Sequence, residues 1–354
     1  MSKVQILVSV IIPIYNMEQY LPECLGSVLA QDIDFLEVIC VNDASEDKSL
    51  QIIQKYAASD DRVIVIDKGK NEGVSIARNT ALEIAKGEYV AFMDPDDYYP
   101  NNHILSNLYS AARDNAVDIC GGIGLMKLFP DGTVLTEKHS FDNHILAIPG
   151  LRYYKDFQFD YHFTCYLYKL DLIKKNHLIF PRYAAFEDPV FFVQAMMAAK
   201  KFYTIDKIVY CYRSIEKPFQ SSIAKTIDIL MGLQDNLKLS RQNNLSRLHY
   251  ISACRLLDIG VSYARNDFKN AALLQTEYKS LIYELIHALA LIDIDWLAQN
   301  GFSVTQNMIV DIFSEAIIST QKYNRILTWP RKIFRFIIPF SIRVRIHRLL
   351  LLGR

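Results

Sequence analysis

The chain has 354 residues, of which 51% are hydrophobic and 22% are charged, as in an ordinary globular protein. Its 39 lysines and arginines balance 39 aspartates and glutamates, and this lack of basic excess argues against a nucleic-acid-binding protein. The six cysteines form no C-x-x-C pair, so we expect buried thiols in a reducing compartment rather than a metal cluster or disulfide framework. No run of eighteen uninterrupted apolar residues is present, and we expect a cytoplasmic protein.

The first hundred residues alternate between strand and helix patterns. Continuous apolar runs predict buried strands over residues 8–14, 36–41, 63–66 and 89–93. Apolar residues spaced three to four apart predict helices over 17–30, 50–57 and 73–86, the last closed by Gly87. This succession predicts an α/β fold with a Rossmann-like, mostly parallel sheet flanked by helices. Ligands of such sheets bind at the carboxyl ends of the strands.

Beyond residue 101 the alternation loosens. A further strand is expected over 117–120, and a helical run extends from Pro189 to Ala199. After about residue 222 the chain reads as mostly helical. We therefore expect three parts: an α/β domain over 1–222, a helical region over 223–320 and a tail over 321–354.

The predicted tail is basic and amphipathic. After Glu315 the chain has nine basic residues and no acid, whereas the preceding part has 30 basic and 39 acidic residues. Basic and large apolar side chains alternate over 329–338 and 342–350, a pattern that favours an anionic membrane surface. We expect peripheral attachment to the inner face of the cytoplasmic membrane, with docking onto the acidic body or an oligomer partner as the alternative.

An acidic cluster, Asp94-Pro95-Asp96-Asp97, follows the fourth predicted strand. Closely spaced carboxylates are unfavourable unless a cation neutralises them. Oxygen ligands suit Mg²⁺ or Mn²⁺, which commonly bridge to the phosphates of a substrate. The alternative is a plain acidic turn that caps a helix starting near Pro100.

Four segments in order carry a family resemblance: VIIPIYN at 10–16, VNDAS at 41–45, ARN at 77–79 and FMDPDD at 92–97. Together they resemble the family 2 glycosyltransferases, inverting enzymes of GT-A fold that use nucleotide sugars. The resemblance is tight over residues 6–100 and continues loosely to about 222. It departs at Ala44, where the family pattern V-x-D-G-S has glycine.

The resemblance implies a nucleotide site at the first two strand ends. Pro13 and Tyr15 match residues that flank the base. Asp43 matches the acid that hydrogen-bonds the uracil of a UDP-sugar.

The resemblance also implies a diphosphate site. Arg78 matches a residue near the ribose and diphosphate, Asp94 matches the ribose-side acid, and Asp96 matches the metal ligand of the D-x-D motif. Arg213, in a Y-R…S segment similar to the family's closing segment, would offset diphosphate charge or order a lid. A plain surface arginine is the alternative for Arg213.

An inverting transfer needs a base on the sugar face opposite the leaving diphosphate. The family places a Glu-Asp pair there, followed by an aromatic residue, and Glu187-Asp188 with Phe191 fits this pattern. We assign Asp188 as the base and Glu187 as a supporting or acceptor-contacting residue. Both carboxylates would also favour the positive end of the helix that starts at Pro189.

These patterns predict a metal-dependent, inverting glycosyltransferase. It would move a hexose or N-acetylhexosamine from a UDP-sugar to a hydroxyl of a glycan or glycolipid, such as lipopolysaccharide, capsule or a lipid-linked oligosaccharide. The alternative is a catalytically silent nucleotide-sugar-binding or scaffold protein. No G-x-G-x-x-G or glycine-rich basic loop follows the first strand, which argues against a dinucleotide-dependent oxidoreductase and a nucleotidyltransferase.

Overall fold

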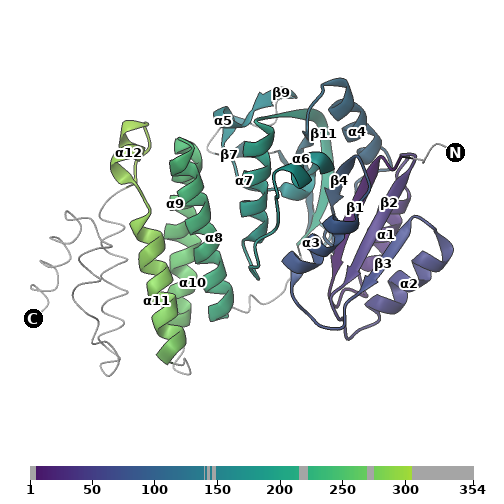
Figure 1. Cartoon of the computed structure of the whole chain (residues 1–354), viewed down its shortest axis with the longest axis horizontal. Helices are drawn as coiled ribbons and strands as arrows, with labels where there is room; N and C mark the ends of the chain where they lie inside the picture. Colours follow the sequence, from purple (N-terminus) through teal and green to yellow (C-terminus); the bar gives the residue numbers. More distant parts are fainter. Residues whose placement is uncertain are drawn as a thin grey trace, which may run out of the picture. The chain divides into compact units, whose positions relative to one another are not determined.

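The computed structural model describes residues 5–138, 140–141, 144–145, 149–214, 222–268 and 275–304. The chain forms two compact units (Figure 1). The first, the sheet unit, comprises Met1–Arg182 and Glu187–Pro218, and the second, the helical unit, comprises Tyr183–Phe186 and Phe219–Arg354. The predicted tail over 321–354 lies outside the described residues.

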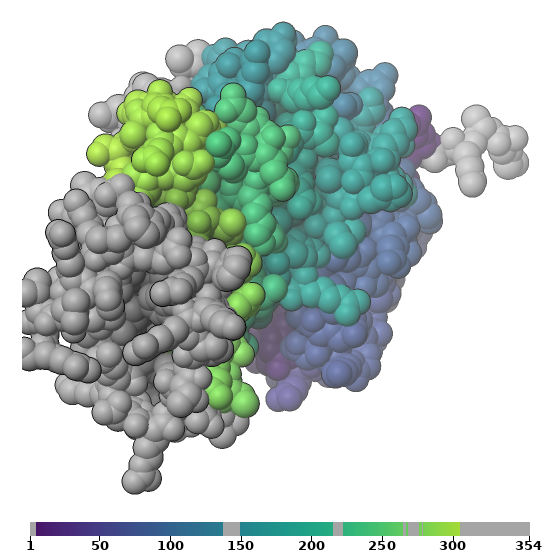
Figure 2. Space-filling model, turned by 60° about the vertical axis from the view of Figure 1, so that its left-hand side comes forward, coloured from purple at the N-terminus to yellow at the C-terminus, as the bar shows by residue number. Residues whose placement is uncertain are grey.

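The sheet unit contains nine strands of one mixed sheet within the described residues: β1 (Val8–Ile14), β2 (Leu36–Asn42), β3 (Val63–Asp67), β4 (Tyr89–Phe92), β5 (Ile119–Leu128), β6 (Val134–Lys138), β9 (Gly150–Tyr153), β10 (Tyr166–Lys169) and β11 (Lys201–Arg213). Their order is β3-β2-β1-β4-β10-β5-β11-β9, with β6 beside β5. A separate short hairpin joins β7 (Ser140–Phe141) to β8 (His144–Ile145). The atoms of this unit, purple to teal, form one continuous body in the space-filling view (Figure 2).

The first four strands are parallel, as predicted. β2 and β3 are added in turn on one side of β1, and β4 is added on its other side, so the topological switch point lies between β1 and β4. Every residue of β1 and β2 is buried, which explains why both segments read as uninterrupted apolar runs. β10 runs antiparallel to β4 and β5, whereas β11 runs parallel to β5. The carboxyl ends of β1, β2, β3, β4 and β11 therefore point toward the same edge of the sheet.

Helices flank this sheet: α1 (Leu21–Leu29), α2 (Ser49–Ser59), α3 (Val74–Ile84), α4 (Ile104–Asp114), α5 (Tyr154–Phe157), α6 (Leu170–Lys175) and α7 (Glu187–Ala199), with a 3₁₀ turn at Phe163–Cys165 (Figure 1). The predicted helices of the first hundred residues are confirmed, although α1 begins four residues later than expected. Pro22 explains this start, because proline is tolerated in the first turn of a helix and not in its interior.

Gly87 was expected to close α3, and that expectation is wrong. The helix ends at Ile84, and Ala85 is already extended at φ −56° and ψ 136°. Instead Gly87 lies against β1, where an added Cβ would be 2.5 Å from the backbone nitrogen of Ser9. The N–H of Gly87 donates to Ser9 Oγ at 2.8 Å, and that hydroxyl donates to the buried carboxylate of Glu37. Glycine is thus needed here for a close approach rather than for a helix cap.

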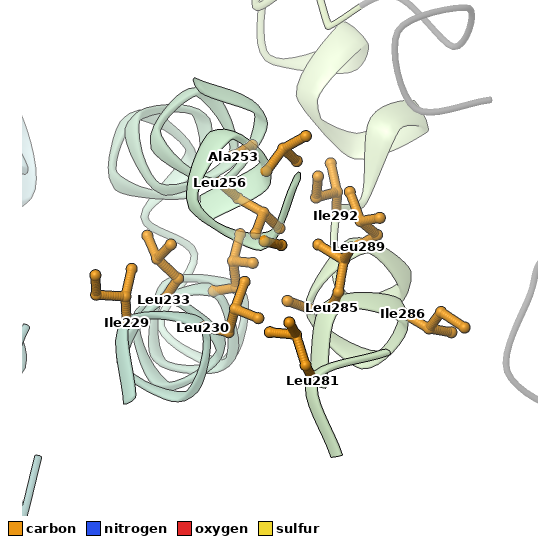
Figure 3. Packing of buried hydrophobic residues seen from close by; sticks show 14 of the residues in the cluster. Ile229, Leu230, Leu233, Ala253, Leu256, Leu281, Leu285, Ile286, Leu289 and Ile292 are labelled. Carbon is orange, nitrogen blue, oxygen red and sulfur yellow. The ribbon is translucent and has the colours of Figure 1, made fainter. Parts of the chain in front are cut away.

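The described part of the helical unit comprises α8 (Ile223–Gln242), α9 (Ser246–Arg255), a π-helical turn (Leu256–Gly260), α10 (Val261–Phe268), α11 (Gln275–Ala290) and α12 (Ile294–Gln299). Its core is a buried apolar cluster to which α8, α9 and α11 all contribute. Leu230 of α8 and Leu285 and Leu289 of α11 fill the space between these helices (Figure 3). Among the described helices, none combines the length and apolarity that crossing a bilayer requires.

Candidate active site

The polar residues singled out in the sequence gather at the carboxyl edge of the sheet. Tyr15 follows β1, Asp43 follows β2 and Asp94 follows β4, while Arg213 ends β11. Lys68, directly after β3, joins them and was not among the predicted site residues. Its position after a predicted strand was the signal that could have identified it.

Asp43 is held by donors from the next strand-helix connection. Its carboxylate accepts from Lys68 Nζ at 2.9 Å, from the N–H of Glu72 at 3.0 Å and from the N–H of Gly73 at 2.7 Å. Only 3% of Asp43 is exposed. These bonds fix the orientation of the Asp43 carboxylate at the end of β2.

The loops after β1 and β2 hydrogen-bond to each other. The side chain of Asn16 accepts from the N–H of Glu46 at 2.8 Å, and the N–H of Asn16 donates to Ser45 Oγ at 3.0 Å. Between Asp43 and this contact lies Ala44, whose φ is +59°. A left-handed backbone favours glycine. This conformation gives a physical reason for the glycine that the family pattern has at this position.

Pro13 and Tyr15 differ in accessibility. Pro13 is buried in β1 opposite Val41. The pairing of β1 with β4 stops at Ile11, so the missing N–H of Pro13 interrupts no bond to that strand. Tyr15 is 42% exposed, so its ring is accessible from solvent, and the predicted roles of both residues stay predictions.

Arg78, on α3, connects two parts of the site. Its Nη1 donates to Glu187 Oε1 at 2.7 Å, and its Nη2 donates to Asp94 Oδ1 at 2.8 Å. The guanidinium lies 4.8 Å and 5.1 Å from the ring centroids of Phe163 and Phe180, and only 4% of the residue is exposed. Burial lowers the pKa of Arg78, but the charges of the carboxylates outweigh this and raise the pKa above its usual range.

Arg78 was expected near the ribose and diphosphate. In the structure its two terminal nitrogens donate to protein carboxylates, one on each side. Arg78 thus joins the acidic turn after β4 to the start of α7. The role assigned to it from the resemblance stays a prediction.

The acidic turn after β4 is compact. The N–H of Asp97 donates to the carbonyl of Asp94 at 3.0 Å, and Asp97 Oδ1 accepts from the N–H of Arg213 at 2.7 Å. Asp97 is only 2% exposed. Burial and the negative charges of Asp94 and Asp96 raise the pKa of Asp97 to about 8, against the opposing effect of the Arg213 N–H.

Arg213 organises this turn through its side chain as well. Its Nε donates to the carbonyl of Asp96 at 3.0 Å, and its Nη2 pairs with Glu23 of α1. The guanidinium lies 5.4 Å from the ring centroids of both Tyr20 and Tyr98. Arg213 thus braces the backbone of the acidic turn. Both interpretations considered for it, a diphosphate or lid residue and a plain surface arginine, stay predictions. Residues 220–221, which belong to the serine end of the Y-R…S segment, lie outside the described residues.

The predicted base, Asp188, is the second residue of α7. Burial and the adjacent Glu187 carboxylate raise its pKa to about 8; Asp94 adds to the effect and Arg78 opposes it. A carboxylate with a pKa near neutrality is well suited to accept a proton and release it again. Arg78, Asp94, Glu187 and Asp188 thus form one electrostatic cluster.

Comparison with known proteins shows what this chain is similar to. Residues 9–177 match the family model described as Glycosyl transferase family 2. This segment is therefore similar to the family 2 glycosyltransferases. The motifs over residues 10–97 that carried the resemblance all lie inside the matched segment.

Proteins similar to this chain include an uncharacterized glycosyltransferase, EpsJ, from Bacillus subtilis, which is 34% identical over 212 residues covering 58% of this chain and 61% of EpsJ. A poly(ribitol-phosphate) beta-glucosyltransferase from Bacillus spizizenii is 34% identical over 206 residues, covering 55% of this chain and 30% of that protein. This chain thus spans less than two thirds of the length of either relative.

Solved structures show the same fold. The crystal structure of Staphylococcus aureus TarS 1–349 in complex with UDP-GlcNAc superposes with a TM-score of 0.64 at 21% identity, covering 92% of this chain and 93% of TarS 1–349. The mannosyltransferase PcManGT from Pyrobaculum calidifontis, in complex with GDP-Man and Mn²⁺, has a TM-score of 0.53 at 19% identity, with 89% and 88% covered. The predicted GT-A fold with a helical C-terminal region is confirmed.

The acidic turn presents oxygen atoms of the kind that divalent cations such as Mg²⁺ prefer. Asp94 and Asp96 offer carboxylate oxygens, and Oδ2 of Asp97 is buried without a hydrogen-bond donor. Within the described ranges, no three His, Cys, Asp or Glu side chains are arranged to hold a metal ion by themselves. Mg²⁺ typically uses one or two carboxylates and completes its shell with substrate phosphates, and this chain offers such a partial set.

Proposed function

We propose that the chain is a metal-dependent, inverting glycosyltransferase. It moves a hexose or N-acetylhexosamine from a UDP-sugar to a hydroxyl of a bacterial surface glycan or glycolipid. The observation that carries this proposal is the Arg78 bridge, which ties Asp94, on the donor side, to Glu187, the neighbour of the base. A single guanidinium thereby holds the two halves that an inverting transfer requires.

The donor half uses the strand ends. Asp43 would accept the uracil N–H, and the exposed ring of Tyr15 would cover the base, supported by the buried Pro13. The S. aureus neighbour with UDP-GlcNAc supports a UDP-sugar as donor. Asp96 would hold Mn²⁺ or Mg²⁺, and the cation, when bound, supplies positive charge to the leaving diphosphate.

The acceptor half uses the start of α7. Asp188 would take the proton of the acceptor hydroxyl while its oxygen bonds to the anomeric carbon and the bond from that carbon to the diphosphate breaks. Glu187, which accepts a hydrogen bond from Arg78, would keep its position at the start of α7. Attack opposite the leaving group inverts the anomeric configuration.

The names of the relatives support a polymer acceptor. One relative is a poly(ribitol-phosphate) beta-glucosyltransferase, and another is the minor teichoic acid biosynthesis protein GgaB of Bacillus subtilis. We propose a hydroxyl of a polyol-phosphate or polysaccharide chain as the acceptor in this protein, which lipid-linked intermediates would also present.

We further propose that the basic residues of the tail attach the chain to the cytoplasmic face of the membrane. Sedimentation with phosphatidylglycerol vesicles tests this, with phosphatidylcholine vesicles as the uncharged control. Replacing Arg343, Arg345 and Arg348 by glutamine should weaken binding and its salt dependence, because each base near an anionic surface contributes about 1 kcal/mol. Equal sedimentation of both proteins would contradict the attachment.

The activity is tested by UDP release from a panel of UDP-hexoses and UDP-N-acetylhexosamines, with and without Mn²⁺ or Mg²⁺. We expect one donor to turn over only with metal, and Asp96→Asn to abolish turnover. Asp188→Asn should abolish transfer to an acceptor extract, whereas the slow hydrolysis of the donor should fall less. Asp171→Asn, at an exposed site on α6, is the matched control.

The outcomes separate the two functions considered. Binding of UDP without turnover of any donor, even with acceptor extract, would favour a silent nucleotide-sugar-binding protein. Failure to bind UDP would overturn the nucleotide site itself.

A further inference from the structure

The residues directly before the proposed base belong to the helical unit. Tyr183–Phe186 group with that unit, whereas Glu187 begins α7 of the sheet unit. The peptide bond between Phe186 and Glu187 therefore links the two units. The backbone of Phe186 defines the direction in which the chain enters the turn with Glu187 and Asp188.

One face of α8 holds the first two residues of this segment by hydrogen bonds. Asp228 Oδ2 accepts from the backbone N–H of Ala184 at 2.7 Å, and Asp235 Oδ2 accepts from the hydroxyl of Tyr183 at 2.8 Å. Asp228 and Asp235 are two helical turns apart, so they lie on the same side of the helix.

Between them, Gly232 leaves room for Phe186. A Cβ added at Gly232 would lie 2.8 Å from Phe186 Cδ1 and 3.0 Å from its carbonyl oxygen. Any side chain at this position would thus displace the backbone of Phe186 and not only its ring.

Phe186 itself has a strained backbone. Its φ of +69° lies in the left-handed region, which is rare for a bulky residue. Such a conformation persists only when the surroundings enforce it. Here the ring of Phe186 packs against the apolar cluster of the helical unit, and the guanidinium of Arg255 lies 5.9 Å from the ring centroid.

We propose that the face of α8 formed by Asp228, Gly232 and Asp235 positions the catalytic base. It keeps Phe186 in its left-handed conformation and thereby sets the approach of the chain to Glu187 and Asp188. The inference rests on the proposed function, in which Asp188 accepts the proton of the acceptor. Because a misplacement of about 1 Å can lower a rate by about 100-fold, a displaced Phe186 backbone should lower the rate of transfer.

Steady-state kinetics with the UDP-sugar that the wild type uses tests the proposal. We expect Gly232→Ala and Tyr183→Phe each to lower kcat for transfer at least about tenfold. KM for the donor and Kd for UDP should stay within about twofold, because Asp43 and Asp94 belong to the other unit. Gly26→Ala is the matched control: this glycine also lies in a helix, and an added Cβ meets nothing within 4 Å.

Two substitutions of Asp228, one conservative and one not, test whether the hydrogen bond to Ala184 is needed for transfer. Asp228→Asn keeps an oxygen that accepts from Ala184 and should retain most of the transfer rate, whereas Asp228→Leu removes the acceptor and should not. The fraction of donor lost to hydrolysis rather than transfer should rise in the impaired variants, since hydrolysis by water depends less on a placed base. A merely structural role would lower transfer, hydrolysis and UDP binding together.

The proposal is overturned if Gly232→Ala and Tyr183→Phe keep kcat within about twofold of wild type, or if kcat and UDP affinity fall in parallel. If Gly232→Ala does not fold, Tyr183→Phe, which removes a single oxygen atom, decides the question. A wild-type chain that transfers no sugar overturns the proposed function and this inference with it. Active wild type with unaffected variants overturns the inference alone.

Discussion

Arg78 and Glu187 lie 109 residues apart in the chain, yet Nη1 of the arginine donates to Oε1 of the glutamate at 2.7 Å. The same guanidinium donates to Asp94, and the rings of Phe163 and Phe180 lie close to it. A buried guanidinium between two carboxylates keeps the acidic turn and the start of α7 at a fixed separation. This contact is the basis of the first prediction.

Arg78→Met should destabilise the protein by about 3–5 kcal/mol, because the buried Glu187 carboxylate and the partly exposed Asp94 carboxylate then lose their cation. The free energy of unfolding in urea measures the change. Arg113→Met is the matched control, since its ion pair with Glu88 is half exposed and should contribute less than about 1 kcal/mol. Equal effects of the two substitutions would contradict the assigned role of Arg78.

The activity of the wild type should rise with pH. The proposed base, Asp188, would accept a proton only when deprotonated, and its pKa is raised to about 8 by burial and by Glu187. Transfer should therefore be low near pH 6, increase through pH 8 and level off above it, in a profile of kcat/KM against pH. Glu187→Gln removes one neighbouring negative charge and should move the rising limb toward lower pH. An unmoved limb would show that a different group governs it.

Metal binding should depend on the nucleotide. The described residues offer oxygen ligands on the acidic turn but no complete cage, so the cation needs phosphate oxygens to complete its shell. Calorimetric titration with Mn²⁺ should show binding at least about tenfold tighter with UDP present, and UDP should bind tighter with Mn²⁺ by the same factor. Asp96→Asn should remove this coupling, while Asp171→Asn should keep it. Tight Mn²⁺ binding without UDP would contradict the shared site.

Ala44→Gly should stabilise the protein. Alanine at φ +59° is strained by about 1–2 kcal/mol, which exceeds the extra entropy that glycine loses on folding, about 0.4–1 kcal/mol. We expect a gain of about 0.5–1 kcal/mol in the free energy of unfolding. Ala57→Gly, inside α2, is the control and should cost about 0.5–1 kcal/mol. A loss of stability in both variants would show that the strain at Ala44 is already relieved.

The sequence alone was sufficient to predict the first strands and helices of the sheet unit. The apolar runs at β1 and β2 and the helical spacing between them depend on local periodicity and burial, which a linear pattern records directly. The sequence also predicted that Asp43 and Asp94 lie at the carboxyl edge of the sheet, because the carboxyl ends of parallel strands share that edge. The end of α3 was not predictable in this way, because Gly87 responds to the proximity of Ser9, 78 residues earlier in the chain.

The tertiary structure decided the pairings between distant residues. Arg78 meets Glu187, and Arg213 braces the turn at Asp96 and Asp97, because folding brings α3, α7 and β11 to the same edge of the sheet. It likewise assigned Tyr183–Phe186 to the helical unit. Contacts over such separations depend on three-dimensional packing and backbone conformation, including the left-handed residue Phe186, and local sequence patterns carry no record of either.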